Sequence, residues 1–537
     1  MGVYGSLSNR TPASSTQAPS HSTDPPCSQS EASACSPVQS EASACGPVQS
    51  KASACGPVQS KASACGPVQS ESGLLWALLQ LTRSHRASVS RKACESLLVL
   101  SSLLDGSSEE LLAARTRLGE LLAGRLQELH LLLPLEELDA TELRSWPPTA
   151  WRSESEPGHM TNFFTWFNFL DHLTRESPQV LGVHVSRCVC QLWLVDALHP
   201  QLLHTCEQVV LVSTSLLCAA VRLVQSSSLL DQIVHFLLRT PSLMELLLQR
   251  CDHISDQISM TSLSLVDELL QKPHRDILDI LVLSFLQSRS YLSSPVGGQE
   301  DRQPESSEDS EDSQDLEEDP FFSDSLSEGP RRRPQSSTAD VVNSFLCLVP
   351  VQVRSAHLLQ EGGYESYVHD ARSLVSQCRG LSLSWSWLQT LPPPTCPPGE
   401  DVVFFEGPLL KVLFDRLGRI LEQPYELNLQ LTAVLSRLSA FDHPLLDEYL
   451  LNPYIHLSHC CRSLFSVLVR VMAELMQRVQ EVSELSDKLL DTRRTLLGLT
   501  PHTGLEHLTL LKGLIVLEEF CKELAAIAFI KLPLDQD

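Results

Sequence analysis

The densest group of metal-binding side chains lies between His456 and Cys461, in the sequence His-Leu-Ser-His-Cys-Cys. Zinc sites need four converging imidazole, thiolate or carboxylate ligands, normally from two separated pairs. We expect a helix over 455–481, on which His456 and Cys460 share one face. Cys460 and Cys461 would then point about 100° apart and could not easily reach one ion. The surrounding leucines and Phe465 are typical of a helix core, so we predict no metal ligand in this stretch.

Three shorter patterns could also do chemistry: a Cys-x-Cys pair, a Cys-x-His pair, and two carboxylates three residues apart. They are Cys188 with Cys190, Cys251 with His253, and Asp276 with Asp279. Neither of the first two supplies the four ligands that zinc requires. The carboxylates follow Pro273 and fit the first turn of a helix, where the dipole favours negative charge. We interpret them as a solvated face rather than an acid–base pair, and the aromatic residues of 163–169 as core rather than a cofactor box.

The sequence motifs of common enzyme classes are absent. Neither G-x-x-x-x-G-K-[ST] nor G-x-G-x-x-G occurs, so no phosphate-binding loop is predicted. H-E-x-x-H and the nucleophile elbow G-x-S-x-G are also missing. A Ser–His–Asp catalytic triad cannot be recognised from the order of its residues in the sequence, and no serine, histidine or aspartate here is marked as a member of one. We therefore predict a protein that is not an enzyme, with no catalytic residue and no cofactor.

Short linear signals lie near the start of the chain and in an acidic stretch. The first six residues fit the M-G-x-x-x-[ST] pattern, which makes Gly2 a candidate for myristoylation. Four serines among acidic residues are candidate phosphorylation sites: Ser306, Ser307, Ser310 and Ser313. Phosphate there would deepen a negative tract able to dock a basic partner. Asp319-Pro320-Phe321-Phe322 places two aromatic rings within the acids, as trafficking peptides do. A solvated linker is the simpler interpretation, and we favour it.

The net negative charge of the chain argues against polyanionic partners. The chain has 537 residues, a formal charge of −25 and a pI near 5.1. Thirteen acidic residues and one arginine lie between Glu300 and Glu328, so about half of this charge is local. A negative field repels phosphate backbones and anionic lipid. We expect neither nucleic acid nor bare membrane as a partner.

The cysteines and hydropathy indicate a cytoplasmic protein. The chain has 17 cysteines, an odd number, and begins with a Ser/Thr/Pro-rich stretch instead of a secretory signal. Cysteines such as Cys218 and Cys521 lie within leucine-rich runs, where free thiols act as small buried apolar groups. The longest uncharged apolar run, Gln208–Val221, has fourteen residues. It is too short to cross a bilayer, so we predict no transmembrane segment.

Periodicity predicts an all-α protein built in four parts. These are a disordered tail (1–72), a helical block (73–292), an acidic Ser-rich disordered linker (293–338) and a second helical block (339–537). The tail carries four near-identical decapeptides from Glu31, whose prolines and small residues cannot bury a core. Their cysteines, Cys35, Cys45, Cys55 and Cys65, could hold metal or lipid, but we interpret the repeats as disordered.

In the two blocks, apolar residues recur at helical spacing and no run alternates with period two. The expected helices cover 74–81, 97–104, 108–132, 160–175, 179–197, 200–224, 227–238, 241–251, 254–271, 274–290, 339–348, 404–421, 425–440, 444–451, 455–481 and 505–530. Short turns between them predict antiparallel pairs. Stacked pairs would form an α-solenoid of the HEAT or armadillo kind.

Several segments together resemble one family. They are Phe163–Leu173, Cys251–Ser259, Leu265–Leu283, Val341–Pro350, Phe404–Leu438, His443–Gln480 and Leu517–Phe529. These segments are similar to the FTS- and Hook-interacting protein (FHIP) family, the largest subunit of the FTS–Hook–FHIP complex, and to its second subfamily in particular. The resemblance covers about Gly73 to the C-terminus.

The resemblance implies an α-solenoid adaptor without catalytic residues. Its implied partners are Hook-family dynein adaptors, the FTS subunit, and Rab GTPases on intracellular membrane cargo, which places it peripherally on endomembranes. The alternative is a signalling scaffold whose phosphorylatable acidic linker recruits kinase-pathway regulators. Family members begin with further helices where this chain has decapeptides, which suggests a truncated or alternatively started form.

Overall fold

A computed structural model describes residues 68–84, 86–103, 109–147, 158–293, 337–351, 354, 363–387, 390–394, 404–499 and 507–532. The chain divides into two units, Met1–Ser70 and Glu71–Asp537, and nearly all described residues belong to the second. The candidate modification residues Gly2, Ser306, Ser307, Ser310 and Ser313 lie outside the described residues, as do Asp319–Phe322 and most of the decapeptides. What the sequence predicts for them stays a prediction.

Regular structure in the described ranges is helical, with no strand and a single isolated bridge between Leu292 and Leu457. The α-helices are α2 (Val68–Thr82), α3 (Ala87–Leu103), α4 (Glu109–Leu131), α5 (Ala140–Arg144), α6 (His159–Glu176), α7 (Gln179–Val189), α8 (His199–Leu202), α9 (Glu207–Leu223), α10 (Ser227–Leu238), α11 (Pro241–Arg250), α12 (Asp256–Leu270), α13 (Arg275–Leu278), α14 (Ser284–Leu286), α15 (Thr338–Leu348), α16 (Glu365–Ser382), α17 (Pro408–Leu417), α18 (Tyr425–Ala440), α19 (Pro444–Leu446), α20 (Leu464–Val479), α21 (Leu485–Leu496) and α22 (Leu508–Lys531). Three π-helical segments join them: η1 (Cys190–Leu198), η2 (Asp279–Leu283) and η4 (Asp447–Leu451). The all-α prediction is confirmed.

Helix starts carry the caps that the sequence supplies. The Ser226 hydroxyl accepts a hydrogen bond from the Leu229 N–H at the start of α10. Ser337 and Ser463 form capping boxes at the starts of α15 and α20. Pro241 and Pro408 occupy the first position of α11 and α17, where the missing N–H costs no helical hydrogen bond. Local chemistry thus fixes where these helices begin.

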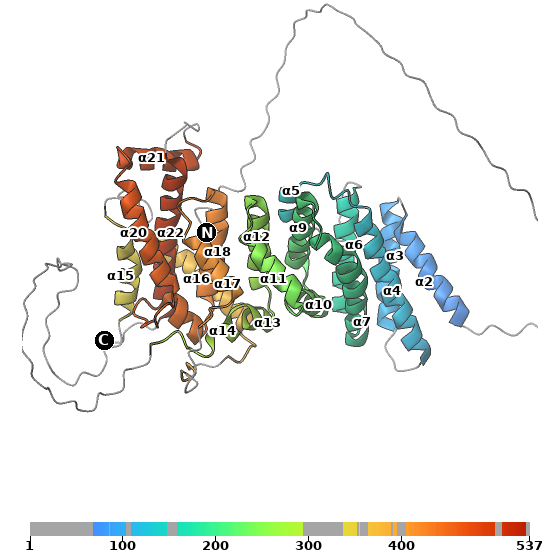
Figure 1. The fold of residues 1–537 in the computed structure, drawn as a ribbon. Coiled ribbons are helices and arrows are strands. Elements are labelled where there is room, and N and C mark those ends of the chain that lie inside the picture. The colour runs from blue at the N-terminus through green and yellow to red at the C-terminus, as the bar shows by residue number, and fades with distance from the viewer. Residues whose placement is uncertain are drawn as a thin grey trace, which may run out of the picture. The chain divides into compact units, whose positions relative to one another are not determined.

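Within the second unit, helices pack mostly against neighbours in the chain (Figure 1). α4 packs against α6 and α7, α10 packs against the same two helices, and α9 packs against α5 and α12. α12 and α11 then contact α18 and α17, which follow the undescribed segment 294–336. α22 differs, since it is packed against α15, α16, α18 and α21 together. The part around α22 is therefore a bundle about one central helix, and the stacked-pair solenoid stays a prediction for the rest.

Several predicted helix boundaries are wrong, among them the start of α3, which lies at Ala87 instead of residue 97. The helix expected over 455–481 begins only at Leu464, because the chain before it adopts an extended and turned backbone. Cys460 there has φ +69°, and the Ser458 N–H donates to the Tyr291 carbonyl at 2.8 Å. The helix expected over 200–224 is broken after Leu202, and α9 begins at Glu207. The last two segments carry apolar residues at helical spacing. A tertiary hydrogen bond holds the first of them in a non-helical backbone, and a local turn interrupts the second.

Three helices lie where none was predicted, namely α5, α16 and α21. α16 and α21 are charged amphipathic helices, with only a few buried residues each. In α21 these are Leu489, Thr492 and Thr495, of which only one is apolar. An apolar pattern this sparse gives little signal, and both helices gain their stability from packing against α22.

One helical stretch passes a test for membrane spans. This stretch is Gln179–Leu202, which comprises α7, η1 and α8. By length and composition alone it could cross a membrane, because its most apolar 18 residues have a mean hydropathy of 1.2. Of these 18 residues, 44% are buried inside the protein. Arg187 and Asp196 interrupt this stretch, so the sequence shows no long uncharged run here. Its buried side chains, such as Val189 and Trp193, belong to the protein core that includes α4 and α6. The predicted absence of a transmembrane segment therefore stays a prediction.

The aromatic residues of α6 are buried, which confirms the core interpretation. Phe163 and Phe167 pack against Trp193, and this cluster encloses His130, which is fully buried. The Trp193 Nε1–H donates to His130 Nδ1 at 3.2 Å, so His130 carries its proton on Nε2 and donates to Gln201 Oε1 at 2.8 Å. Burial lowers the pKa of His130 to about 4.

We expect His130 to make the fold sensitive to acid. An unfolded histidine takes up a proton near pH 6.5, whereas the folded one does so only near pH 4. The stabilisation is complete above pH 6.5 and falls as the pH drops towards 4, by at most about 3 kcal/mol. His130→Asn can keep an acceptor for Trp193. Between pH 6.5 and pH 4, its free energy of unfolding in urea should fall by less than that of the wild type. The exposed His369→Asn is the control, and an identical pH slope for wild type and His130→Asn would contradict the assignment.

Candidate functional site

The structure separates or buries the side chains that sequence patterns suggested for chemistry. Cys460 lies on a loop rather than a helix, and its Sγ is 2.9 Å from Nδ1 of the adjacent His459. The helical geometry expected for this cluster is therefore wrong. Elsewhere, Cys188 Sγ lies 3.5 Å from His184 Nε2, one turn away on α7. Among the described residues, no group of three His, Cys, Asp or Glu side chains is placed to hold a metal ion.

The remaining candidates have structural partners. Cys251 is fully buried, and burial raises the pKa of its thiol to about 12, so it stays protonated. The His253 ring Nδ1 accepts the Ser255 N–H at 3.0 Å. Asp276 pairs with Arg239 at 2.5 Å, and Asp279 pairs with Arg275 at 2.8 Å on the surface. Both carboxylates are thus partly exposed and paired with arginines.

A buried arginine joins the two helical regions of the second unit. Arg416, near the end of α17, is only 4% exposed. Its Nη2 donates to the His253 carbonyl at 2.8 Å and to the Ser259 hydroxyl at 2.6 Å. Its Nε lies 2.7 Å from an Asp252 oxygen and 3.2 Å from the Cys251 carbonyl. One guanidinium therefore holds the loop between α11 and α12 against α17.

Other charged pairs reinforce this junction between distant segments. Arg437 of α18 pairs with Asp267 of α12 at 2.7 Å, and both side chains are largely buried. Arg289 pairs with Glu448, which also accepts the Tyr291 hydroxyl at 2.7 Å. Because buried charges are costly unless fully paired, such contacts favour one arrangement of the helices. These pairs connect helices that lie far apart in the sequence.

Arg416 was not predicted, although the sequence contains a signal for it. Leu409, Leu413 and Ile420 recur at the spacing of one buried helix face, and Arg416 occupies the next position on that face. A charged residue at an apolar position needs buried partners. The Asp252 carboxylate is such a partner, but nothing in the local sequence connects it to α17.

A second polar group surrounds the central helix α22. Glu518 is only 1% exposed and pairs with Arg493 of α21 and with Lys522, the latter at 2.8 Å. The Lys522 ammonium also lies over the Tyr367 ring of α16, 5.7 Å from its centre. At the end of α22, Lys531 donates to the carbonyls of Ser439 and Phe441, which terminate α18. Charged side chains of α22 thus fix three neighbouring helices to it.

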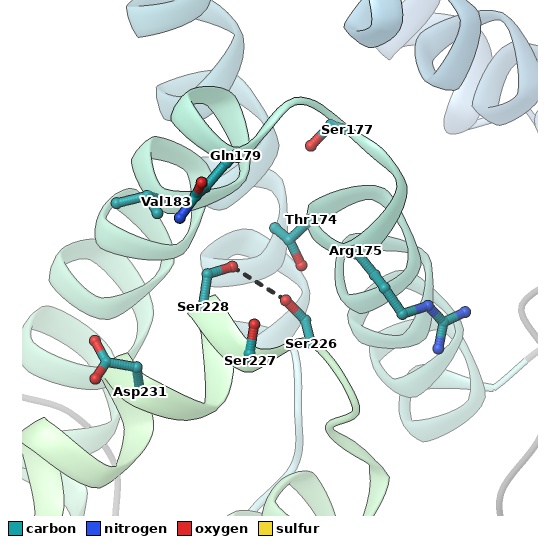
Figure 2. A pocket seen from close by; sticks show the side chains of 9 residues that line it. All are labelled: Thr174, Arg175, Ser177, Gln179, Val183, Ser226, Ser227, Ser228 and Asp231. Atoms are coloured by element: carbon teal, nitrogen blue, oxygen red, sulfur yellow. Dashed lines mark hydrogen bonds between the residues drawn. The ribbon is translucent and has the colours of Figure 1, made fainter. Parts of the chain in front are cut away.

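Two adjoining pockets lie along α7 and share Gln179 and Val183 in their walls. The first has a volume of about 410 Å³ and is shown in Figure 2. Its lining residues are Thr174, Arg175, Ser177, Gln179, Val183, Ser226, Ser227, Ser228 and Asp231. The second, of about 390 Å³, is lined by Arg115, Thr116, Gln179, Val180, Val183, His184 and Arg187. We call the two together the α7 groove.

The α7 groove is polar at one end and basic at the other. Hydroxyl groups of α6, α10 and the turn before α7 line the first pocket, where Ser226 and Ser228 hydroxyls lie 3.1 Å apart (Figure 2). Arg115, His184 and Arg187 line the second pocket. The groove was not predicted, because its walls come from helices far apart in sequence.

Comparison with known proteins finds three family matches in order along the chain. Residues 47–286 match the RAI16-like family, described as retinoic acid induced 16-like protein. Residues 406–499 match a family of unknown function (DUF5917), and residues 505–534 match the KELAA motif. The first match begins before Gly73, the residue at which the resemblance was expected to start. The third contains α22 and its buried pairs.

Individual relatives match over shorter stretches. An FHIP family protein of Nematostella vectensis is 36% identical over 91 residues, which is 17% of this chain and 10% of the relative. The FHF complex subunit HOOK-interacting protein 1A is 31% identical over 91 residues in Mus musculus and 33% over 73 residues in Homo sapiens. Those stretches cover 15% and 14% of this chain, and only 8% and 7% of the relatives. The chain is thus similar to the RAI16-like family over residues 47–286 and to FHIP proteins over shorter stretches.

Proposed function

We propose that this chain is a non-enzymatic adaptor that binds Hook-family proteins together with FTS and links them to membrane cargo through a Rab GTPase. The observation that carries the proposal is the similarity to proteins named as HOOK-interacting subunits of the FHF complex. Assignment to the second subfamily belongs to the same proposal. Because the aligned stretches are a small part of those relatives, their partners come to this chain as a hypothesis.

The architecture supports a binding role over a catalytic one. Long helices fixed by buried ion pairs at Arg416, Arg437 and Glu518 give a frame whose surfaces keep their relative positions. A preorganised surface loses less conformational entropy when a partner binds. The frame therefore suits an adaptor, whichever of its faces meets each partner.

Reconstitution tests the proposal. We expect purified full-length chain to co-elute with recombinant Hook and FTS in size-exclusion chromatography, and tagged chain to recover both from cells. A variant without residues 1–66 keeps all of α2 and shows whether the tail is needed. Recovery of kinase-pathway regulators with neither Hook nor FTS would contradict the proposal and favour the signalling scaffold. Failure of the purified proteins to co-elute would exclude direct binding.

A further inference from the structure

Residues of the first turn of α7, Gln179 and Val180, line the α7 groove. α7 begins at Gln179 after Pro178, and no side chain caps its first N–H groups. Unpaired N–H groups and the positive end of the helix dipole together attract anions. The opposite wall is different, because Ser226 caps α10 and Asp171 accepts the N–H groups of Gln225 and Ser226 at 2.8 Å each.

A buried hydroxyl independently indicates a ligand at this place. Ser177 is only 9% exposed, lines the first pocket, and its Oγ has no hydrogen-bond partner. Figure 2 shows this hydroxyl turned towards the space between Thr174 and Gln179. A buried hydroxyl without a partner costs about 1–3 kcal/mol, so a ligand that accepts its hydrogen bond would recover that energy.

The charges around the groove favour an anion. Arg175 lines the first pocket, where it donates to Gln225 Oε1 at 2.5 Å and pairs with Glu176 at 3.4 Å. Arg187, exposed on α7, makes no ion pair with a described residue, and it lines the second pocket with Arg115 and His184. The one carboxylate that lines either pocket is Asp231, whose Oδ1 lies 3.4 Å from His274 Nε2.

Two pockets that share part of their walls favour a peptide over a small ion. Val180 is 62% exposed and Val183 lines both pockets, so an apolar strip runs between the polar end and the basic end. An extended chain could place one anionic group at the start of α7 and further acidic residues near Arg187. Phosphate suits the first position because its three oxygens accept several hydrogen bonds at once.

We propose that the α7 groove binds a phosphorylated, acidic segment of a partner protein. The phosphate accepts hydrogen bonds from the first N–H groups of α7 and from the Ser177 hydroxyl. Acidic residues of the same segment pair with Arg187, and an apolar residue covers Val180. This proposal does not depend on the proposed binding of Hook and FTS.

Binding to full-length protein tests the site. The probe is a fluorescein-labelled pool of short acidic peptides with a central phosphoserine, measured by fluorescence anisotropy. We expect the unphosphorylated pool to bind at least about tenfold more weakly, as loss of a charge-assisted hydrogen bond implies. Equal binding of the two pools would overturn the proposal.

Variants locate the site. Val180→Asp places a carboxylate at the start of α7, where it favours the helix but repels the ligand. We expect it to abolish binding while the thermal midpoint stays equal or rises. Ser177→Ala and Arg187→Glu should each weaken binding about tenfold, whereas Arg372→Glu, on an exposed face of α16, should not. Full binding by Val180→Asp would overturn the site even if the peptides bind elsewhere.

Competition identifies the ligand class. We expect inorganic phosphate to compete only weakly, because it lacks the acidic and apolar contacts of the peptide. If inorganic phosphate bound as tightly as the peptides, the groove would be an isolated anion site. That result would contradict the proposal of a peptide ligand. Displacement of the peptide pool by vesicles containing phosphatidylserine or phosphoinositides, but not by neutral vesicles, would favour a membrane surface instead.

Discussion

Replacing Arg416 with methionine should lower the free energy of unfolding by about 3–5 kcal/mol, the usual cost of removing one partner from a buried charged cluster. Methionine fills much of the same volume but donates no hydrogen bond. The carbonyls of Cys251 and His253 and the Ser259 hydroxyl would lose the Arg416 donor. The change should be measured as a shift of the urea midpoint.

Arg419 offers a matched control for Arg416. Its Nη2 lies 2.5 Å from the same Asp252 oxygen, but its side chain is 46% exposed. Exposed ion pairs contribute only about 0–1 kcal/mol, so Arg419→Met should have a small effect. Faster hydrogen exchange in residues 251–259 of Arg416→Met alone would localise the loss to the junction. Equal destabilisation by the two variants would show that Arg416 stabilises the protein mainly through Asp252 and not through the buried carbonyls.

Replacing Gly513 with alanine should destabilise the protein by about 1–3 kcal/mol, although alanine is the better helix former. Gly513 lies in α22 where the helix touches the turn after α17. A Cβ atom there would approach the Ile420 carbonyl oxygen to 2.6 Å and the Leu421 Cα to 3.0 Å. Both are backbone atoms, so α22 or the turn would have to move. The thermal midpoint should therefore fall.

Gly124 provides the opposite case. It lies inside α4, and a Cβ atom at this position would meet nothing within 4 Å. Gly124→Ala should therefore stabilise the protein by up to about 1 kcal/mol, because alanine loses less backbone entropy than glycine in a helix. Opposite signs for the two substitutions would establish the close contact at Gly513. A midpoint that rises for both would mean that α22 is more loosely packed than the structure indicates.

The sequence predicted local structure well where one side of a helix is continuously apolar. α6, α10 and α18 lie within a few residues of their predicted ranges, and the aromatic residues of α6 are core as expected. Helix formation depends on residues about four positions apart, and that spacing is visible in a single sequence. α21 was missed because only Leu489 is apolar among its buried residues.

The sequence by itself determined that the described protein is helical, where most of its long helices lie, and which family it resembles. Only the tertiary structure decided that Cys460 lies on a loop and that Arg416 meets residues 157–165 positions away. It also decided that α4, α7 and α10 enclose a groove with Ser177 in its wall. Such contacts depend on which helix faces meet, and this is set by the packing of the whole chain. No local spacing encodes it.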